Sequence, residues 1–116
     1  MIALLSACQT HELIFVGESE NWSAEVTVAQ TSGDEQYEIQ INYKGNDIES
    51  VKIFDYFVET SSNGVLNFGG YNVSLNEKGM YQNKSLSSNR PSTKRKEELV
   101  LKVKWNGITE IFVLGN

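Results

Sequence analysis

Side chains that commonly do covalent or metal chemistry are scarce in this chain, which has one histidine, His11, and one cysteine, Cys8. A nucleophilic triad needs a base held rigidly against its nucleophile, and we expect His11 to lie in a mobile tether, three residues past Cys8. A zinc site needs about three or four His, Cys or carboxylate ligands. We therefore expect no triad catalysis, no zinc centre and no cofactor.

Oxygen-bearing side chains gather at two places that could contribute to a calcium site: Glu18, Glu20 and Asn21, and Asn46, Asp47 and Glu49. Calcium takes about six to eight oxygen ligands, often from loops. Neither cluster has the spacing of an EF-hand, so solvated acidic loops are the favoured interpretation. Glycoside hydrolysis needs two carboxylates that face each other across a cleft, and sequence positions alone do not indicate such a pair.

Basic side chains are concentrated in one short segment that carries Arg90, Lys94, Arg95 and Lys96. The chain has a net charge of -5, so without these four charges the remainder carries -9. An acidic chain lacks the positive field that nucleic-acid binding requires, and we expect no nucleic-acid partner. The segment is either a solvated loop or a contact for an anionic lipid or cell-wall polymer.

The position of Cys8 is informative because it separates an apolar run, residues 1–7, from a polar segment. A single cysteine cannot form an internal disulfide, so the core alone must hold the fold. A free cysteine is often a small buried hydrophobe, but a junction between apolar and polar segments is an unusual place for one. The apolar run is far shorter than the roughly 20 residues that span a bilayer.

The stretch Leu5-Ser6-Ala7-Cys8 resembles the lipobox of bacterial lipoproteins. The resemblance implies a diacylglyceryl thioether on Cys8, with fatty acids such as palmitate, and cleavage before Cys8. Residues 1–7 would then be the remnant of a signal peptide, 8–18 the lipidated N-terminus and a flexible tether, and 19–116 the folded domain. The apolar run is short and no Lys or Arg precedes it, so we expect the true start to lie upstream.

Alternation of apolar and polar side chains predicts β-strands through most of the chain. Stretches 22–28 and 37–43 have an apolar residue at every second position, which is typical of a strand with one buried face. Stretch 51–58 has apolar residues at both parities, so we expect it to be covered on both sides. Two short strands are expected at 65–68 and 71–75.

The C-terminal part predicts one long loop followed by a hairpin. Residues 83–96 lack periodicity and are expected to form the loop. Asn106-Gly107 between alternating hydrophobic residues is a strong hairpin signal because both residues tolerate positive φ. A two-residue turn fixes the register, and the predicted pairs are Trp105 with Ile108, Val103 with Glu110, Leu101 with Phe112, and Leu99 with Leu114.

About seven short strands and no helical stripe favour an all-β fold, a single antiparallel β-sandwich of immunoglobulin-like type. A small β-barrel is the alternative. Trp22 and Trp105 could stack on sugars, but each continues the apolar parity of its strand, so we expect both in the core. Glu110 shares the apolar face of its hairpin, and we expect it near the rim of the sandwich.

Both ends of the chain resemble small secreted lipoproteins of Bacillus and related Firmicutes, through residues 17–22 (GESENW) and 97–107 (EELVLKVKWNG). The resemblance implies an anchor on the outer face of the cell membrane and a compact β domain, but no activity. We expect a monomeric, non-enzymatic binding module at the cell envelope, with the membrane and an envelope protein or anionic polymer as partners. A carboxylate-dependent envelope hydrolase and a small-ligand carrier are the alternatives.

Overall fold

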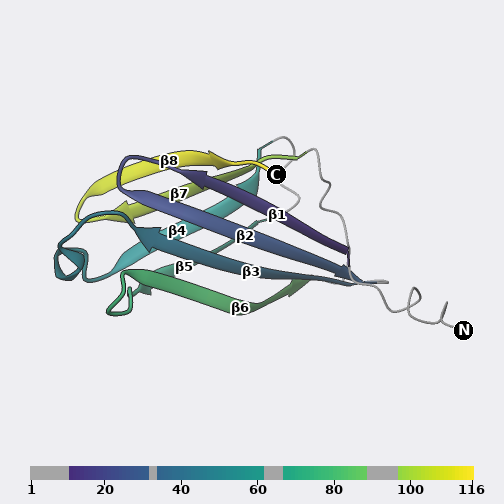
Figure 1. The fold of residues 1–116 in the computed structure, drawn as a ribbon, viewed down its shortest axis with the longest axis horizontal. Helices are drawn as coiled ribbons and strands as arrows, with labels where there is room; N and C mark the ends of the chain where they lie inside the picture. Colours follow the sequence, from purple (N-terminus) through teal and green to yellow (C-terminus); the bar gives the residue numbers. More distant parts are fainter. Residues whose placement is uncertain (1–10, 32–33, 62–66, 89–96) are drawn as a thin grey trace, which may run out of the picture.

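The computed structural model describes residues 11–31, 34–61, 67–88 and 97–116, which form two antiparallel β-sheets packed face to face (Figure 1). The strands are β1 (His11–Glu18), β2 (Trp22–Thr31), β3 (Asp34–Tyr43), β4 (Phe54–Thr60), β5 (Asn67–Val73), β6 (Met80–Ser88), β7 (Leu99–Trp105) and β8 (Ile108–Leu114). A short 3-10 helix, η2 (Ile48–Ser50), precedes β4. The predicted β-sandwich is confirmed, and the described strands do not close into a barrel.

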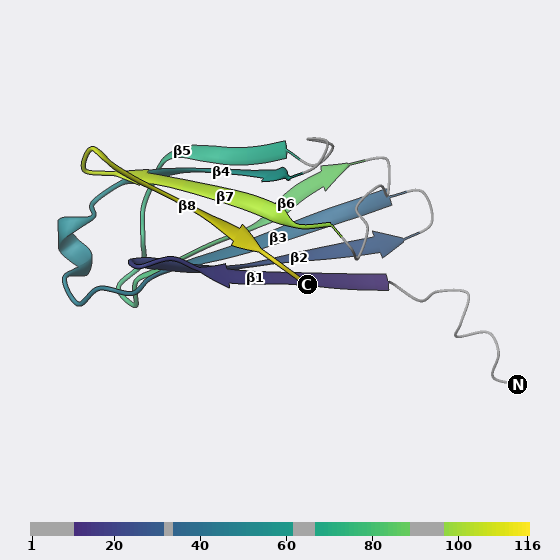
Figure 2. The same ribbon diagram turned by 90° about the horizontal axis from the view of Figure 1, so that it is seen from above.

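The strand order is β1-β2-β3-β6 in the first sheet, sheet A, and β5-β4-β7-β8 in the second, sheet B. Figure 2 shows the two layers from the side, with β8 lying across β1. The immunoglobulin-like expectation holds for the two-layer architecture, but constant-type immunoglobulin domains divide seven strands differently between their sheets.

The core lies between the sheets and consists of the inward-facing residues of the alternating strands. Its largest fully buried side chains are Trp22, Phe15, Phe54, Leu13, Ile39, Ile41, Leu99, Leu101 and Leu114. Trp105 is also buried, so the prediction that both tryptophans belong to the core is confirmed. Each such side chain contributes about 1.5–3 kcal/mol by leaving water, and these contributions stabilise the fold without a disulfide.

The C-terminal hairpin has the predicted register throughout. Trp105 pairs with Ile108, Val103 with Glu110, Leu101 with Phe112, and Leu99 with Leu114. Asn106 and Gly107 have φ of 48° and 76°, the left-handed pair that a two-residue primed turn requires.

The flexible tether predicted for residues 8–18 is wrong over residues 11–18, which form strand β1 along the whole of β2. Leu13 and Phe15 are buried, whereas Ile14 and Val16 stay exposed. Because the exposed residues Ile14 and Val16 are also apolar, the sequence shows no alternation here, although Leu13 and Phe15 belong to the core. The folded domain therefore includes residues 11–18 and does not begin at residue 19.

Three further expectations are corrected. The loop predicted at 83–96 is wrong for residues 83–88, because β6 pairs with β3 up to Ser88. The strands predicted at 65–68 and 71–75 are replaced by one strand, β5, that runs through Gly69-Gly70. The stretch 51–58 is covered on one face only: Phe54, Tyr56 and Val58 are buried, but Ile53 and Phe57 are about half exposed, at 51% and 46%.

The sheets meet along one side, where β1 approaches the end of β8. Val16 and Gly115 exchange two backbone hydrogen bonds of 2.9 Å. Gly17 permits this approach, because a Cβ built on it would lie 2.1 Å from the carbonyl oxygen of Val113. The first and last strands therefore join sheet A to sheet B through main-chain hydrogen bonds as well as side-chain packing.

Candidate functional site

The residues that the sequence singled out for function lie outside the described residues: Cys8, Arg90, Lys94, Arg95 and Lys96. The described residues next to them show where these segments join the sandwich. His11 pairs with Gln30 on β2. Ser88 pairs with Glu35 on β3, which is the neighbour of β2 in sheet A. The strand end that continues to residue 10 and the strand end that continues to residue 89 therefore lie at the same end of sheet A (Figure 1).

A buried carboxylate, Glu35, lies at this same end. Its side chain is fully buried and accepts hydrogen bonds from the Tyr37 hydroxyl and from Gln30 Nε2, both at 2.6 Å. The Tyr37 ring in turn stacks on Phe68 of sheet B, with ring centroids 5.6 Å apart. The polar groups near this end are thus fixed by hydrogen bonds to a buried acid.

In the described part of the chain, the first acidic cluster forms an ion pair and the second lies at the short helix η2. The Glu18 carboxylate lies 2.8 Å from Lys44 Nζ, and this hydrogen bond and charge lower the pKa of Glu18. The second cluster flanks η2, where the Asp47 carbonyl accepts from Ser50. Among the described residues no three His, Cys, Asp or Glu side chains converge as metal ligands.

Glu110 joins the turn between β1 and β2 to the C-terminal hairpin. Its carboxylate accepts hydrogen bonds from the Ser19 hydroxyl, from Asn21 Nδ2 at 2.5 Å and from the Asn21 backbone N–H at 3.1 Å. Partial burial acts to raise the pKa of Glu110, but these hydrogen bonds and the Lys44 charge outweigh it and lower the pKa below its usual value. Glu110 is therefore a charged link between the two sheets.

This link predicts a loss of stability in acid. Because the pKa of Glu110 is lower in the folded chain, its contribution is complete above the unfolded pKa and disappears as the pH falls through the folded pKa. Glu110→Gln should lower the free energy of unfolding at pH 7 by about 1 kcal/mol. The variant should also make the free energy of unfolding, measured by urea denaturation, fall less steeply as the pH is lowered into the acid range. Glu25→Gln, at an exposed position of sheet A, is the control, and an equal flattening there would contradict the assignment.

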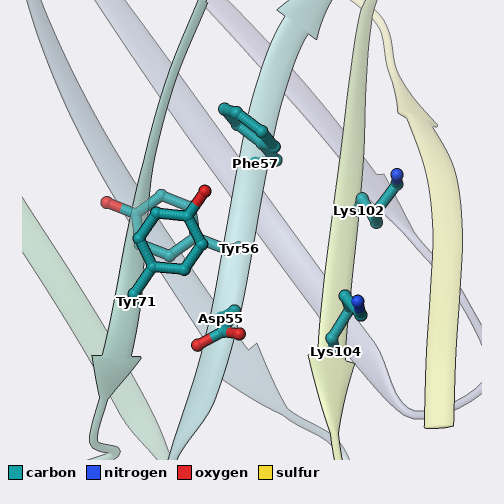
Figure 3. Close-up of a pocket in the computed structure, with 6 residues that line it drawn as sticks. All are labelled: Asp55, Tyr56, Phe57, Tyr71, Lys102 and Lys104. Atoms are coloured by element: carbon teal, nitrogen blue, oxygen red, sulfur yellow. The ribbon is translucent and has the colours of Figure 1, made fainter.

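The outer face of sheet B carries a hollow of about 230 Å³, shown in Figure 3. Strand β4 forms its floor and contributes Asp55 and Phe57. Tyr71 projects from β5 on the side toward β4, and Lys102 and Lys104 project from β7 on the other side of β4. In the register of the sheet, Phe57 lies opposite Lys102, and Asp55 lies opposite Lys104.

Two local contacts position the aromatic side of this hollow. Gly69 pairs with Phe57, and a Cβ on Gly69 would lie 2.9 Å from Phe57 Cδ1, so the ring occupies space that any other residue would fill. Asp55 Oδ1 accepts a 2.8 Å hydrogen bond from the Asn72 backbone, where φ is 54°. This bond fixes the chain beside Tyr71, whose side chain is 72% exposed.

Neither lysine of the hollow belongs to an ion pair within the described residues. The two ion pairs found among the described residues join Lys44 to Glu18 and Lys84 to Glu38, and neither involves Lys102 or Lys104. The Asp55 carboxylate lies opposite Lys104 and accepts a hydrogen bond from a neutral backbone N–H, so it offsets one of the two positive charges. The hollow therefore presents two ammonium groups, two accessible aromatic rings and one carboxylate, a combination that can hold a partly apolar anion.

Sequence reasoning missed this hollow. The stretch 51–58 was expected to be covered on both sides, and an exposed Phe was therefore not considered. The signal that the sequence did contain is the alternation of Lys102 and Lys104 with the core residues of β7, which places both lysines on the outer face.

Searches for similar proteins gave no match to a family model, a curated protein or a solved structure. The resemblance to Bacillus lipoproteins therefore stays a prediction. In the part of the chain that the structure describes, no helix has the length and apolar character needed to cross a membrane.

Proposed function

We propose that the protein is a bacterial lipoprotein, anchored through Cys8 to the outer face of the cell membrane, whose sandwich is a non-enzymatic binding module of the envelope. The observation that carries the proposal is the position of two strand ends in the sandwich. The β1 end that leads to Cys8 and the β6 end that leads to the basic segment lie at the same end of sheet A, on its two edge strands.

This arrangement suits an anchored domain. A chain held at Cys8 has only Gln9 and Thr10 before β1 begins, so the end of sheet A near His11 is held within about 10 Å of the anchor. A Lys or Arg close to an anionic leaflet contributes about 1 kcal/mol. Four bases that start from this end of the sandwich would reinforce the anchor, whereas bases at the opposite end would not.

The interior of the domain favours a binding role over that of a carrier. A carrier needs an enclosed cavity, but rings fill the space between the sheets: Trp22 packs against Phe54, Tyr43 and Trp105 with centroids 5.0–5.3 Å apart. The hollow described above lies on the outside, where a partner has direct access.

The anchor is tested by replacing Cys8 in a bacterial host. The chain with an intact signal peptide should partition into the detergent phase, since two acyl chains hold a protein firmly where one does not. Cys8→Ala should move nearly all of it to the aqueous phase. Retention of Cys8→Ala in washed membranes would contradict the proposal.

The basic segment is tested separately with the unlipidated chain and anionic vesicles. Binding should be measurable at low ionic strength and should weaken as salt is added, because exposed charges are screened. Changing Arg90, Lys94, Arg95 and Lys96 to glutamine should abolish it. Binding that the four changes leave intact would assign the segment no role at the membrane.

A further inference from the structure

We propose that the hollow on the outer face of sheet B, formed by Asp55, Phe57, Tyr71, Lys102 and Lys104, binds an anionic saccharide, that is, sugar rings that carry carboxylate or phosphate groups. The proposal rests on the binding role proposed above and gives that role a ligand. Its test uses the unlipidated chain, so a failed anchor and a failed saccharide site give different results.

The aromatic rings supply the surface on which sugar rings pack. A pyranose has a face of C–H groups that is apolar, and it packs well on an aromatic ring whose opposite side is supported. Phe57 and Tyr71 are 46% and 72% exposed and lie on neighbouring strands of sheet B. Trp22 and Trp105, the rings that the sequence first suggested for sugar stacking, are in the core and have no such surface.

The lysines supply the charge and its spacing. Lys102 and Lys104 are two residues apart on β7 and project from the same face (Figure 3). Alternate residues of a strand are about 7 Å apart, so the two ammonium groups present a repeated positive charge along the strand. This repeat suits a chain with regularly spaced anions, and the Asp55 carboxylate beside it can accept hydrogen bonds from sugar hydroxyls.

The position of the hollow favours a saccharide over an acidic peptide. Extended peptides bind sheets chiefly by adding a strand to an open edge. The hollow lies over β4, whose two neighbours β5 and β7 already pair with its backbone. The central strand of the hollow therefore offers no open edge, and the exposed rings and charges around it are the groups that would recognise a ligand.

The test is affinity electrophoresis of the unlipidated chain in gels that contain defined polymers. Polygalacturonate should retard the protein, and neutral galactan should retard it much less. Lys102→Gln with Lys104→Gln should weaken retardation by polygalacturonate about tenfold. Tyr71→Ala should weaken it by a similar factor. All three side chains are exposed, so the variants should fold, which circular dichroism checks.

The matched control is Lys78→Gln with Lys84→Gln, which removes the same charge from exposed positions outside the hollow. It should leave retardation nearly unchanged. Equal weakening in the control would overturn the proposal. Retardation by polyglutamate that Tyr71→Ala leaves intact would overturn it in favour of an acidic peptide.

The same chemistry could come from a wall polymer or from a glycolipid headgroup. Teichoic acid that carries sugar substituents, and vesicles that contain glucuronosyl diacylglycerol, separate these sources. Binding to either that needs both Tyr71 and the two lysines supports the site and names its source. Binding to neither, together with a negative result for polygalacturonate, would end the proposal even if Cys8 proves to be lipidated.

Discussion

Trp22→Ala should lower the free energy of unfolding by about 3–5 kcal/mol, the usual cost of deleting a large buried ring. Trp22 is fully buried and contacts three other rings from both sheets. Phe54 likewise contacts three rings, those of Trp22, Tyr56 and Tyr81, so the two side chains together form the centre of the aromatic cluster. Urea denaturation followed by far-UV circular dichroism measures the change, and Ile108→Ala, at a half-exposed position, should shift it by no more than about 0.5 kcal/mol.

A second substitution at the same position separates packing from hydrogen bonding. The Trp22 Nε1–H is buried and has no hydrogen-bond partner in the described part of the chain. An unpaired buried donor costs about 1–3 kcal/mol, and phenylalanine removes it while keeping a ring. Trp22→Phe should therefore cost less than half of what Trp22→Ala costs. Equal losses in the two variants would contradict this prediction.

Gly17→Ala should be the most damaging single-methyl change, at about 3 kcal/mol, the upper end of the range for overpacking. The added Cβ would meet the Val113 carbonyl oxygen at 2.1 Å and Leu114 Cδ2 at 2.9 Å. A carbonyl within a paired strand cannot rotate away, so β8 must move from β1. The variant should also speed amide hydrogen exchange at Val16 and Gly115, whose mutual hydrogen bonds close this side.

Gly115→Ala is the control for this change, because an added Cβ there meets nothing within 4 Å. It should alter the free energy of unfolding by no more than about 0.5 kcal/mol. A loss at Gly115 as large as that at Gly17 would mean that the backbone freedom of glycine matters there, and not the close approach of β8.

The parts of the fold that the sequence predicted are those in which local chemistry decides. Asn106-Gly107 sets a two-residue turn, and such a turn leaves one register for the strands on either side. Strict alternation in β2 and β3 likewise specifies which face is buried. Glu110 could be placed near the rim because a carboxylate on an apolar face needs polar partners, although Ser19 and Asn21 were not identified as those partners.

The parts that were missed depend on contacts distant in sequence. Strand β1 looks like a continuous apolar run, and only its pairing with β2 shows that Leu13 and Phe15 face inward. Strand β6 is largely polar and is held in place by β3. The hollow in sheet B combines residues from β4, β5 and β7, so no window of sequence contains it. A pattern within one strand cannot report which strands become neighbours.

The pairing of β1 with β2 has a mechanical consequence for a domain held by a lipid at Cys8. A force on such an anchor would pull β1 from its N-terminal end, nearly along the strand. The ladder from His11–Gln30 to Glu18–Ser23 would then be loaded in shear, with its hydrogen bonds sharing the force and not breaking one at a time. The bridge between Val16 and Gly115 adds a second attachment. Strand β1 would thus act as a mechanical clamp, and a domain attached in this way could bear tension from the cell wall without unfolding.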